Sequence, residues 1–134
     1  SLLPSFSFPE ISGGKVTNLH LKPNCPSIIF YFDPDCDHCQ EEATMINENL
    51  ELFKNVNLMF VAFADSAAIR NFKNTFFPGV TRMYLYFCSD PTYSFDKVFG
   101  YSQAPCIHVY DKTRKKVKVF RNEIAPEELI KFAQ

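Results

Sequence analysis

The chain has 134 residues, a formal net charge of −1 at pH 7 and an aromatic content of 16% without tryptophan. This length suits one domain, residues 1–134, that can bury a core of its own. No basic stripe favours nucleic acid as a partner, and no apolar run approaches the length of a membrane span. We expect a single domain, a monomer, that binds no nucleic acid.

The first half of the chain alternates strand and helix patterns. Residues 1–26 are predicted to form an N-terminal extension with a short edge strand at 15–21, and residues 27–134 form the core. The run 27–32 is apolar on both faces, which is typical of a central strand covered by helices. Apolar residues then recur at helical spacing. The predicted elements are a helix over about 37–54, a strand at 56–64 and a helix at 66–76.

The second half continues with a strand at 83–88 and a loop or short helix at 90–100. Two short strands, 107–110 and 117–120, flank a basic turn and predict an antiparallel hairpin. Proline followed by two acids predicts a final helix at 126–133. The order of elements predicts an α/β fold with a central mixed β-sheet flanked by helices on both faces. The helix at 66–76 is expected on the face opposite to the first helix, or at the sheet edge.

The most informative motif is Cys36-Asp37-His38-Cys39, which follows the first central strand and opens the first helix. A helix N-terminus favours an anion, and the thiolate is the reactive form of cysteine. Cys39 lies one turn later on the same helix face, within reach of a disulfide with Cys36. His38 is predicted to favour the Cys36 thiolate, and Asp37 to oppose it by charge repulsion. The motif predicts a dithiol switch.

Two other interpretations of the motif fit less well. A zinc site needs a second pair of ligands, and the remaining cysteines stand alone, at positions 25, 88 and 106. We therefore expect no metal. A purely structural disulfide would close so short a loop that it constrains little of the unfolded chain. Cys106 could be a third redox thiol or a buried small residue, and no role is assigned to Cys25 or Cys88.

The stretch Phe32 to Glu42, together with Ala104-Pro105 at the head of the predicted hairpin, resembles the thioredoxin-like fold. More narrowly, the chain is similar to the bacterial TlpA- and ResA-type thiol-disulfide oxidoreductases over nearly its whole length. The resemblance implies that Cys36 attacks and Cys39 resolves. It also implies that Pro105 is a cis-proline, that Ala104 pairs with a substrate peptide, and that Glu42 handles a proton.

This chain departs from the family at the motif itself. Asp35 stands where tryptophan usually precedes the first cysteine, and the usual proline between the cysteines is missing. Phe30 occupies the position of the buried aspartate of true thioredoxins, so proton handling must differ and Glu42 is the available substitute. These departures leave the two cysteines themselves in place.

The resemblance implies an enzyme that reduces protein disulfides through a redox-active Cys36–Cys39 disulfide and needs no other cofactor. Its partners would be protein disulfide or dithiol substrates and a membrane-linked thiol electron donor. Its expected location is the periplasm or another extracytoplasmic space. One form of this expectation is a protein anchored to the membrane through a missing N-terminal segment. The alternatives are a non-enzymatic redox-sensing or binding module, a peroxiredoxin-type thiol peroxidase and a metal-binding protein. Asp33 disfavours the peroxidase, since peroxiredoxins carry threonine three residues before their cysteine.

Overall fold

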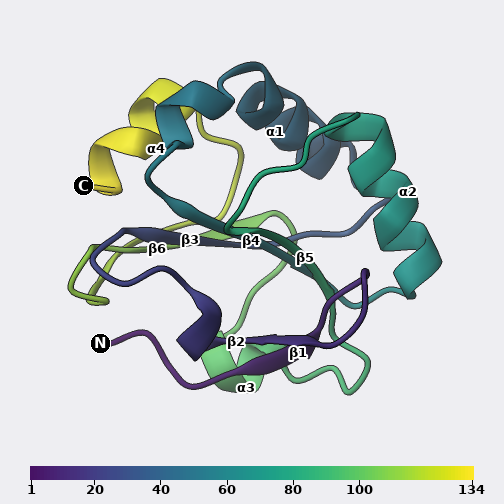
Figure 1. Ribbon diagram of the computed structural model, residues 1–134, viewed down its shortest axis with the longest axis horizontal. Coiled ribbons are helices and arrows are strands. Elements are labelled where there is room, and N and C mark those ends of the chain that lie inside the picture. Colours follow the sequence, from purple (N-terminus) through teal and green to yellow (C-terminus); the bar gives the residue numbers. More distant parts are fainter.

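The computed structural model describes residues 1–134 and is built around a five-stranded sheet (Figure 1). Its strand order is β5 (Leu85–Ser89), β4 (Asn57–Ala62), β3 (Ser27–Tyr31), β6 (Cys106–Tyr110) and β7 (Lys116–Phe120). β3 is parallel to β4 and β4 to β5, whereas β6 is antiparallel to both β3 and β7. The predicted mixed sheet is confirmed, and the two strands with two-sided apolar runs, β3 and β4, lie inside it.

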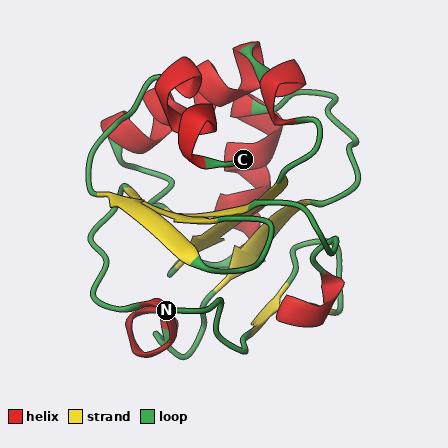
Figure 2. Ribbon diagram, turned by 90° about the vertical axis from the view of Figure 1, so that its left-hand side faces the viewer, coloured by secondary structure: helices red, strands yellow, loops and turns green.

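Three helices form a layer on one face of this sheet, as Figures 1 and 2 show. They are α1 (Asp37–Glu48), α2 (Ser66–Phe76) and α4 (Pro126–Phe132). Strand residues such as Ile28 and Phe60 pack there against Ile46 of α1, Phe72 of α2 and Leu129 of α4, all at most 2% exposed. This larger core ties the helix that carries the two motif cysteines to the centre of the sheet.

The second long helix, α2, lies on the same face as α1, over β5 at the sheet edge. The expectation of an edge position is confirmed, and the alternative of the opposite face is wrong. The reason is topological: the chain moves from β3 to β4 to β5 in one direction across the sheet. Two right-handed crossovers in the same direction place both helices on one face.

The opposite face is covered by smaller elements. These are β1 (Ser7–Pro9), β2 (Lys15–Thr17), a short 3₁₀ turn (Asn18–His20) and α3 (Phe95–Phe99). A second core joins Phe8, Val16 and Phe95 to Met59 and Val61 of β4. The N-terminal segment therefore contributes buried side chains to the core.

The strand expected at 15–21 is shorter than predicted and does not join the main sheet. β2 ends at Thr17, whose hydroxyl accepts a hydrogen bond from the Leu19 backbone N–H and so starts the 3₁₀ turn. It pairs only with β1. The segment meets β5 elsewhere, where the Ile11 N–H donates to the Phe87 carbonyl at 3.0 Å.

The first helix is also shorter than the predicted 37–54. It ends at Glu48, because the backbone N–H of Asn49 turns back to the Ile46 carbonyl at 3.0 Å and its side-chain amide donates to Met45 O. A separate 3₁₀ turn, Leu50–Phe53, follows and buries Phe53. The predicted apolar face of the helix is preserved across this break.

Candidate active site at the start of helix α1

The turn between β3 and α1 sets the position of the first motif cysteine. Asp33 Oδ1 accepts a hydrogen bond from the Asp35 N–H at 2.9 Å, and the Asp33 carbonyl accepts one from the Cys36 N–H at 3.0 Å. The Gln40 side chain, one turn into the helix, donates to the Pro34 carbonyl at 2.8 Å. These bonds fix a tight turn that ends with Cys36 as the N-cap residue of α1.

The two motif cysteines are adjacent and differ in exposure. Cys36 Sγ accepts a hydrogen bond from the Cys39 backbone N–H at 3.4 Å, the bond that a capping side chain makes. Cys36 is half-buried, whereas Cys39 is 3% exposed, and both are free thiols. Burial raises the pKa of the Cys39 thiol well above its ordinary value. The two thiols therefore differ in environment: Cys36 caps the helix and lines a pocket, whereas burial keeps the Cys39 thiol neutral.

Glu42 is a buried carboxyl on the same helix, one turn after Cys39. It is 2% exposed, its Oε1 accepts a hydrogen bond from the Ile124 N–H at 2.8 Å, and its Oε2 has no hydrogen-bond partner in the protein. Burial raises its pKa to about 7, although the Ile124 bond works in the opposite direction. At neutral pH this group can both hold and release a proton.

His38 lies at the surface, and its imidazole Nδ1 is paired with Glu123 of the loop before α4. The hydrogen bond and the charge of Glu123 raise the pKa of His38. His38, Glu41 and Glu123 place one potential ligand atom each within 4.8 Å of the others, a spacing that a metal ion could bridge. Asp37 lies in the first turn of α1 and is exposed. Within the motif, the His38 side chain is thus paired with Glu123, and no hydrogen bond joins it to Cys36.

The second predicted segment meets the first across a pocket. The Ala104–Pro105 peptide bond is cis, as the sequence analysis expected. Ala104 lines the same pocket as Cys36, and Pro105 is buried at the start of β6. Cys36 and the residue before the proline, Ala104, therefore line one pocket, although they are far apart in sequence.

Cys106 follows the proline but belongs to the other face of the sheet. Its neighbour on the strand, Ile107, packs in the core beneath α1, whereas Cys106 Sγ lies 3.4 Å from His108 Nε2, near α3. Cys106 is 1% exposed, and burial raises its pKa. Cys88 is fully buried and Cys25 partly so. The interpretation of Cys106 as a buried small residue fits this placement, in a more polar setting than expected.

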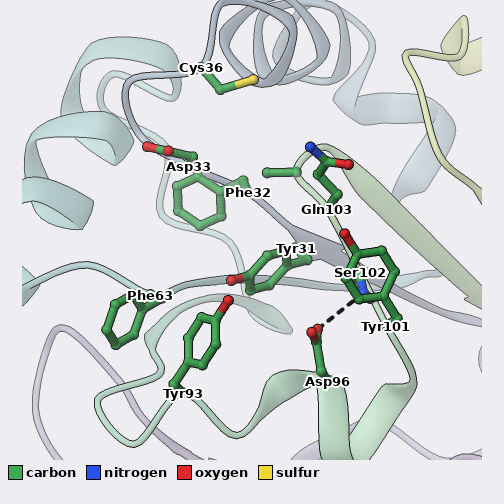
Figure 3. A pocket seen from close by; sticks show the side chains of 11 residues that line it. Tyr31, Phe32, Asp33, Cys36, Phe63, Tyr93, Asp96, Tyr101, Ser102 and Gln103 are labelled. Atoms are coloured by element: carbon green, nitrogen blue, oxygen red, sulfur yellow. Dashed lines mark hydrogen bonds between the residues drawn. The ribbon is translucent and has the colours of Figure 1, made fainter.

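The pocket has a volume of about 480 Å³, with Cys36 at one end and Tyr93 and Asp96 at the other (Figure 3). Its walls come from four parts of the chain, and the sequence analysis had connected only the turn after β3 and the loop before β6. The four parts are the end of β3 and its turn, the loop after β4 with Phe63, the region of α3, and the loop before β6 with Tyr101. Single aromatic residues in separate loops have no periodic signal, so only the fold could bring them together.

Comparison with solved structures identifies the fold. A secreted Mycobacterium tuberculosis disulfide oxidoreductase, homologous to Escherichia coli DsbE, superposes with a TM-score of 0.79 at 17% identity, covering 94% of this chain and 92% of its own. M. tuberculosis DsbF gives a TM-score of 0.79 at 24% identity, with 94% and 90% covered. The chain has the thioredoxin-like fold.

The peroxidoxin BcpB of M. tuberculosis matches as well, with a TM-score of 0.80 at 14% identity over 98% of this chain and 93% of that one. No protein-family model and no curated protein sequence matches the chain. Solved structures of proteins with different chemistry thus superpose equally well on this chain, so the fold alone does not distinguish between activities and the side chains of the site have to be compared. None of the helices is long and apolar enough to cross a membrane.

Proposed function

We propose that this thioredoxin-like protein is a thiol-disulfide oxidoreductase that reduces protein disulfides through Cys36 and Cys39. The observation that carries the proposal is the pairing of two different thiols. Cys36 is the N-cap residue of α1 and lines a pocket, and buried Cys39 donates its backbone N–H to the Cys36 sulfur. A thiol at a helix N-terminus that a substrate can reach through a pocket is suited to attack, and a buried thiol beside it is suited to resolution. The DsbE- and DsbF-like neighbours support the same chemistry.

The reaction proceeds in two exchanges that balance in electrons and protons. The Cys36 thiolate attacks one sulfur of the substrate disulfide, so a Cys36–substrate disulfide forms and the other substrate sulfur leaves as a thiolate that takes up a proton. Cys39 then loses its proton and attacks Cys36 Sγ, which releases the second substrate sulfur as a thiolate that is protonated in turn. The substrate gains two electrons, and the Cys36–Cys39 pair is oxidised to a disulfide.

Glu42 is the proposed acceptor for the Cys39 proton. Its pKa of about 7 makes it an effective base near neutral pH. No hydrogen bond joins it to Cys39, so the transfer requires a water molecule that enters during the reaction and reaches the unpaired Oε2. His38 and Asp37 adjust the charge around Cys36 from the surface.

Substrate docking is assigned to the segment before β6. The backbone of Ala104 would pair with the substrate peptide, and Pro105 would hold that backbone toward the pocket shared with Cys36. A protein disulfide would reach Cys36 through this open pocket, and a membrane-linked thiol donor would return the oxidised pair to the dithiol. The secreted neighbour supports an extracytoplasmic location.

The competing functions make different demands on the site. A thiol peroxidase would use Cys36 against a peroxide, but the Asp33 carboxylate three residues earlier would repel the developing charge. A redox-sensing module would oxidise the pair without turning over a substrate. A metal-binding protein would take up zinc or copper in stoichiometric amount through the motif thiols.

Variants at the two cysteines test the proposal. Cys39→Ser should accumulate a covalent mixed disulfide between Cys36 and a disulfide substrate, because no thiol remains to resolve it. Cys36→Ser should trap nothing and reduce nothing, and Cys88→Ser serves as the matched control that keeps wild-type turnover. Turnover of hydrogen peroxide but not of a disulfide, or disulfide reduction by Cys36→Ser at the wild-type rate, would overturn the proposal.

A further inference from the structure

The pocket beside Cys36 carries an unusual group of exposed aromatic rings. Phe63, Tyr93 and Tyr101 are 57%, 61% and 71% exposed, and all three line it. The rings of Phe63 and Tyr93 meet edge to face with centroids 4.8 Å apart. Large apolar side chains that gather in solvent around one pocket indicate a binding surface.

The charges that line the pocket have one sign. Asp33 lies at the end near Cys36 and Asp96 at the far end, and no lysine, arginine or histidine is among the lining residues (Figure 3). Asp96 Oδ1 accepts a hydrogen bond from the Ser102 N–H at 3.0 Å, which holds that carboxylate in place. Arg121 donates a hydrogen bond to the backbone carbonyl of Tyr101 at 3.0 Å and forms no ion pair with either carboxylate. The pocket therefore combines aromatic rings with uncompensated carboxylates.

Tyr31 lies in the same negatively charged surroundings. Its ring lies between the two carboxylates in the pocket, and its pKa is raised to about 12 by burial and by neighbouring groups, among them Tyr93, Asp96 and Asp33. A negative field that discourages a phenolate attracts a cation. Aromatic faces also attract ammonium and guanidinium groups, and they pack against the aliphatic stems of lysine and arginine.

We infer that this pocket binds a lysine or arginine side chain of the substrate polypeptide, close to the disulfide that Cys36 attacks. This inference rests on the proposed function and narrows its substrate class to disulfides flanked by basic residues. The peptide backbone lies along Ala104, its cysteine reaches Cys36, and the cationic side chain enters between Tyr93 and Tyr101 toward Asp96. The carboxylates Asp33 and Asp96 discriminate between substrates by charge, and the aromatic rings hold the stem.

Peptides that differ only in charge test the inference. Three disulfide-cyclised peptides carry lysine, glutamine or glutamate next to the first cysteine, and their reduction by the reduced protein is timed at low and high salt. Each rate is divided by the rate with dithiothreitol, which removes the intrinsic reactivity of each peptide. The normalised lysine-to-glutamate ratio should be about five to ten at low salt and should fall as salt screens the field.

The double variant Asp33→Asn, Asp96→Asn should bring this ratio below about two, since asparagine keeps the hydrogen-bond acceptor and removes the charge. Glu51→Gln, at an exposed acid outside the pocket, is the matched control and should leave the ratio unchanged. Equal normalised rates for the three peptides, or a double variant that keeps the wild-type ratio, would overturn the inference while the proposed function stands.

A binding measurement separates the inference from the redox chemistry. Serine-substituted versions of the lysine and glutamate peptides are titrated into the reduced protein while the aromatic resonances of Phe63, Tyr93 and Tyr101 are followed by NMR. The lysine peptide should shift them and the glutamate peptide should not. If the lysine peptide binds in this way but no disulfide is reduced, the proposed function fails and the pocket assignment stands; if neither peptide shifts these resonances, the pocket assignment fails.

Discussion

Replacing the buried carboxyl of Glu42 by an amide should stabilise the protein at alkaline pH. Glu42 is 2% exposed and its Oε2 has no partner, so its ionisation in the folded state is unfavourable. Its pKa rises from 4.5 to about 7 on folding. The stabilising contribution of the neutral acid is therefore complete below pH 4.5 and is lost as the pH rises through 7.

The size of the effect follows from that difference in pKa. At about 1.4 kcal/mol for each pKa unit, the folded state of the wild type loses about 3 kcal/mol between pH 4.5 and pH 8 through this group. Glu42→Gln keeps an oxygen that can accept the Ile124 N–H bond and carries no charge at any pH. The variant should match the wild type near pH 4.5 and exceed its free energy of unfolding by up to about 3 kcal/mol at pH 8.

Urea unfolding of the reduced proteins at several pH values between 4.5 and 8 measures this difference. Glu48→Gln, at an exposed position of the same helix, is the control and should show no such pH dependence. A Glu42→Gln variant that is less stable than the wild type at pH 8, or a difference that does not change with pH, would refute the reasoning. The same variant should resolve the mixed disulfide more slowly, so that stability is gained where a functional group is lost.

Three further predictions concern the site and the core. Alkylation of the reduced protein at mildly acidic pH should label Cys36 roughly tenfold or more faster than buried Cys39, as peptide mapping would show, and faster labelling of Cys39 would reverse the assigned roles. Glu123→Gln should lower the pKa of His38 toward its ordinary value in an NMR titration, and an unchanged pKa would mean that the ion pair does not form in solution. Asn57→Ala should destabilise the fold by about 2 to 4 kcal/mol, because the buried amide anchors the loop before β3 through several hydrogen bonds; a loss below about 1 kcal/mol in urea unfolding would contradict this.

Much of the sheet could be predicted from local patterns. The runs around Phe30 and Phe60 are apolar on both faces, and both side chains are buried in the core beneath α1. The helix at 66–76 matches α2, since Asp65 caps it through the Ala68 N–H and Pro78 follows its end. These signals are local in sequence and do not depend on tertiary contacts.

The remaining features depend on contacts between distant segments. Periodicity marks one face of α2 as buried but does not say which face of the sheet it covers. The hydrogen-bond donor to the Glu42 carboxyl, the backbone N–H of Ile124, lies 82 residues further along the chain. The aromatic wall of the pocket is formed by Phe63, Tyr93 and Tyr101 from three separate loops. These placements follow from the way the strands and helices are connected in the complete fold, which no local sequence pattern specifies.

The most direct test of the central claim is the redox titration of the wild-type protein in glutathione buffers, with the disulfide mapped by mass spectrometry. We expect one two-electron transition that joins Cys36 to Cys39, at a potential nearer to about −270 mV, the value of a reductase such as thioredoxin, than to about −120 mV, that of a strong oxidant. A titration in which Cys36 and Cys39 form no disulfide with each other, or in which they do so near −120 mV, would contradict a dithiol reductase.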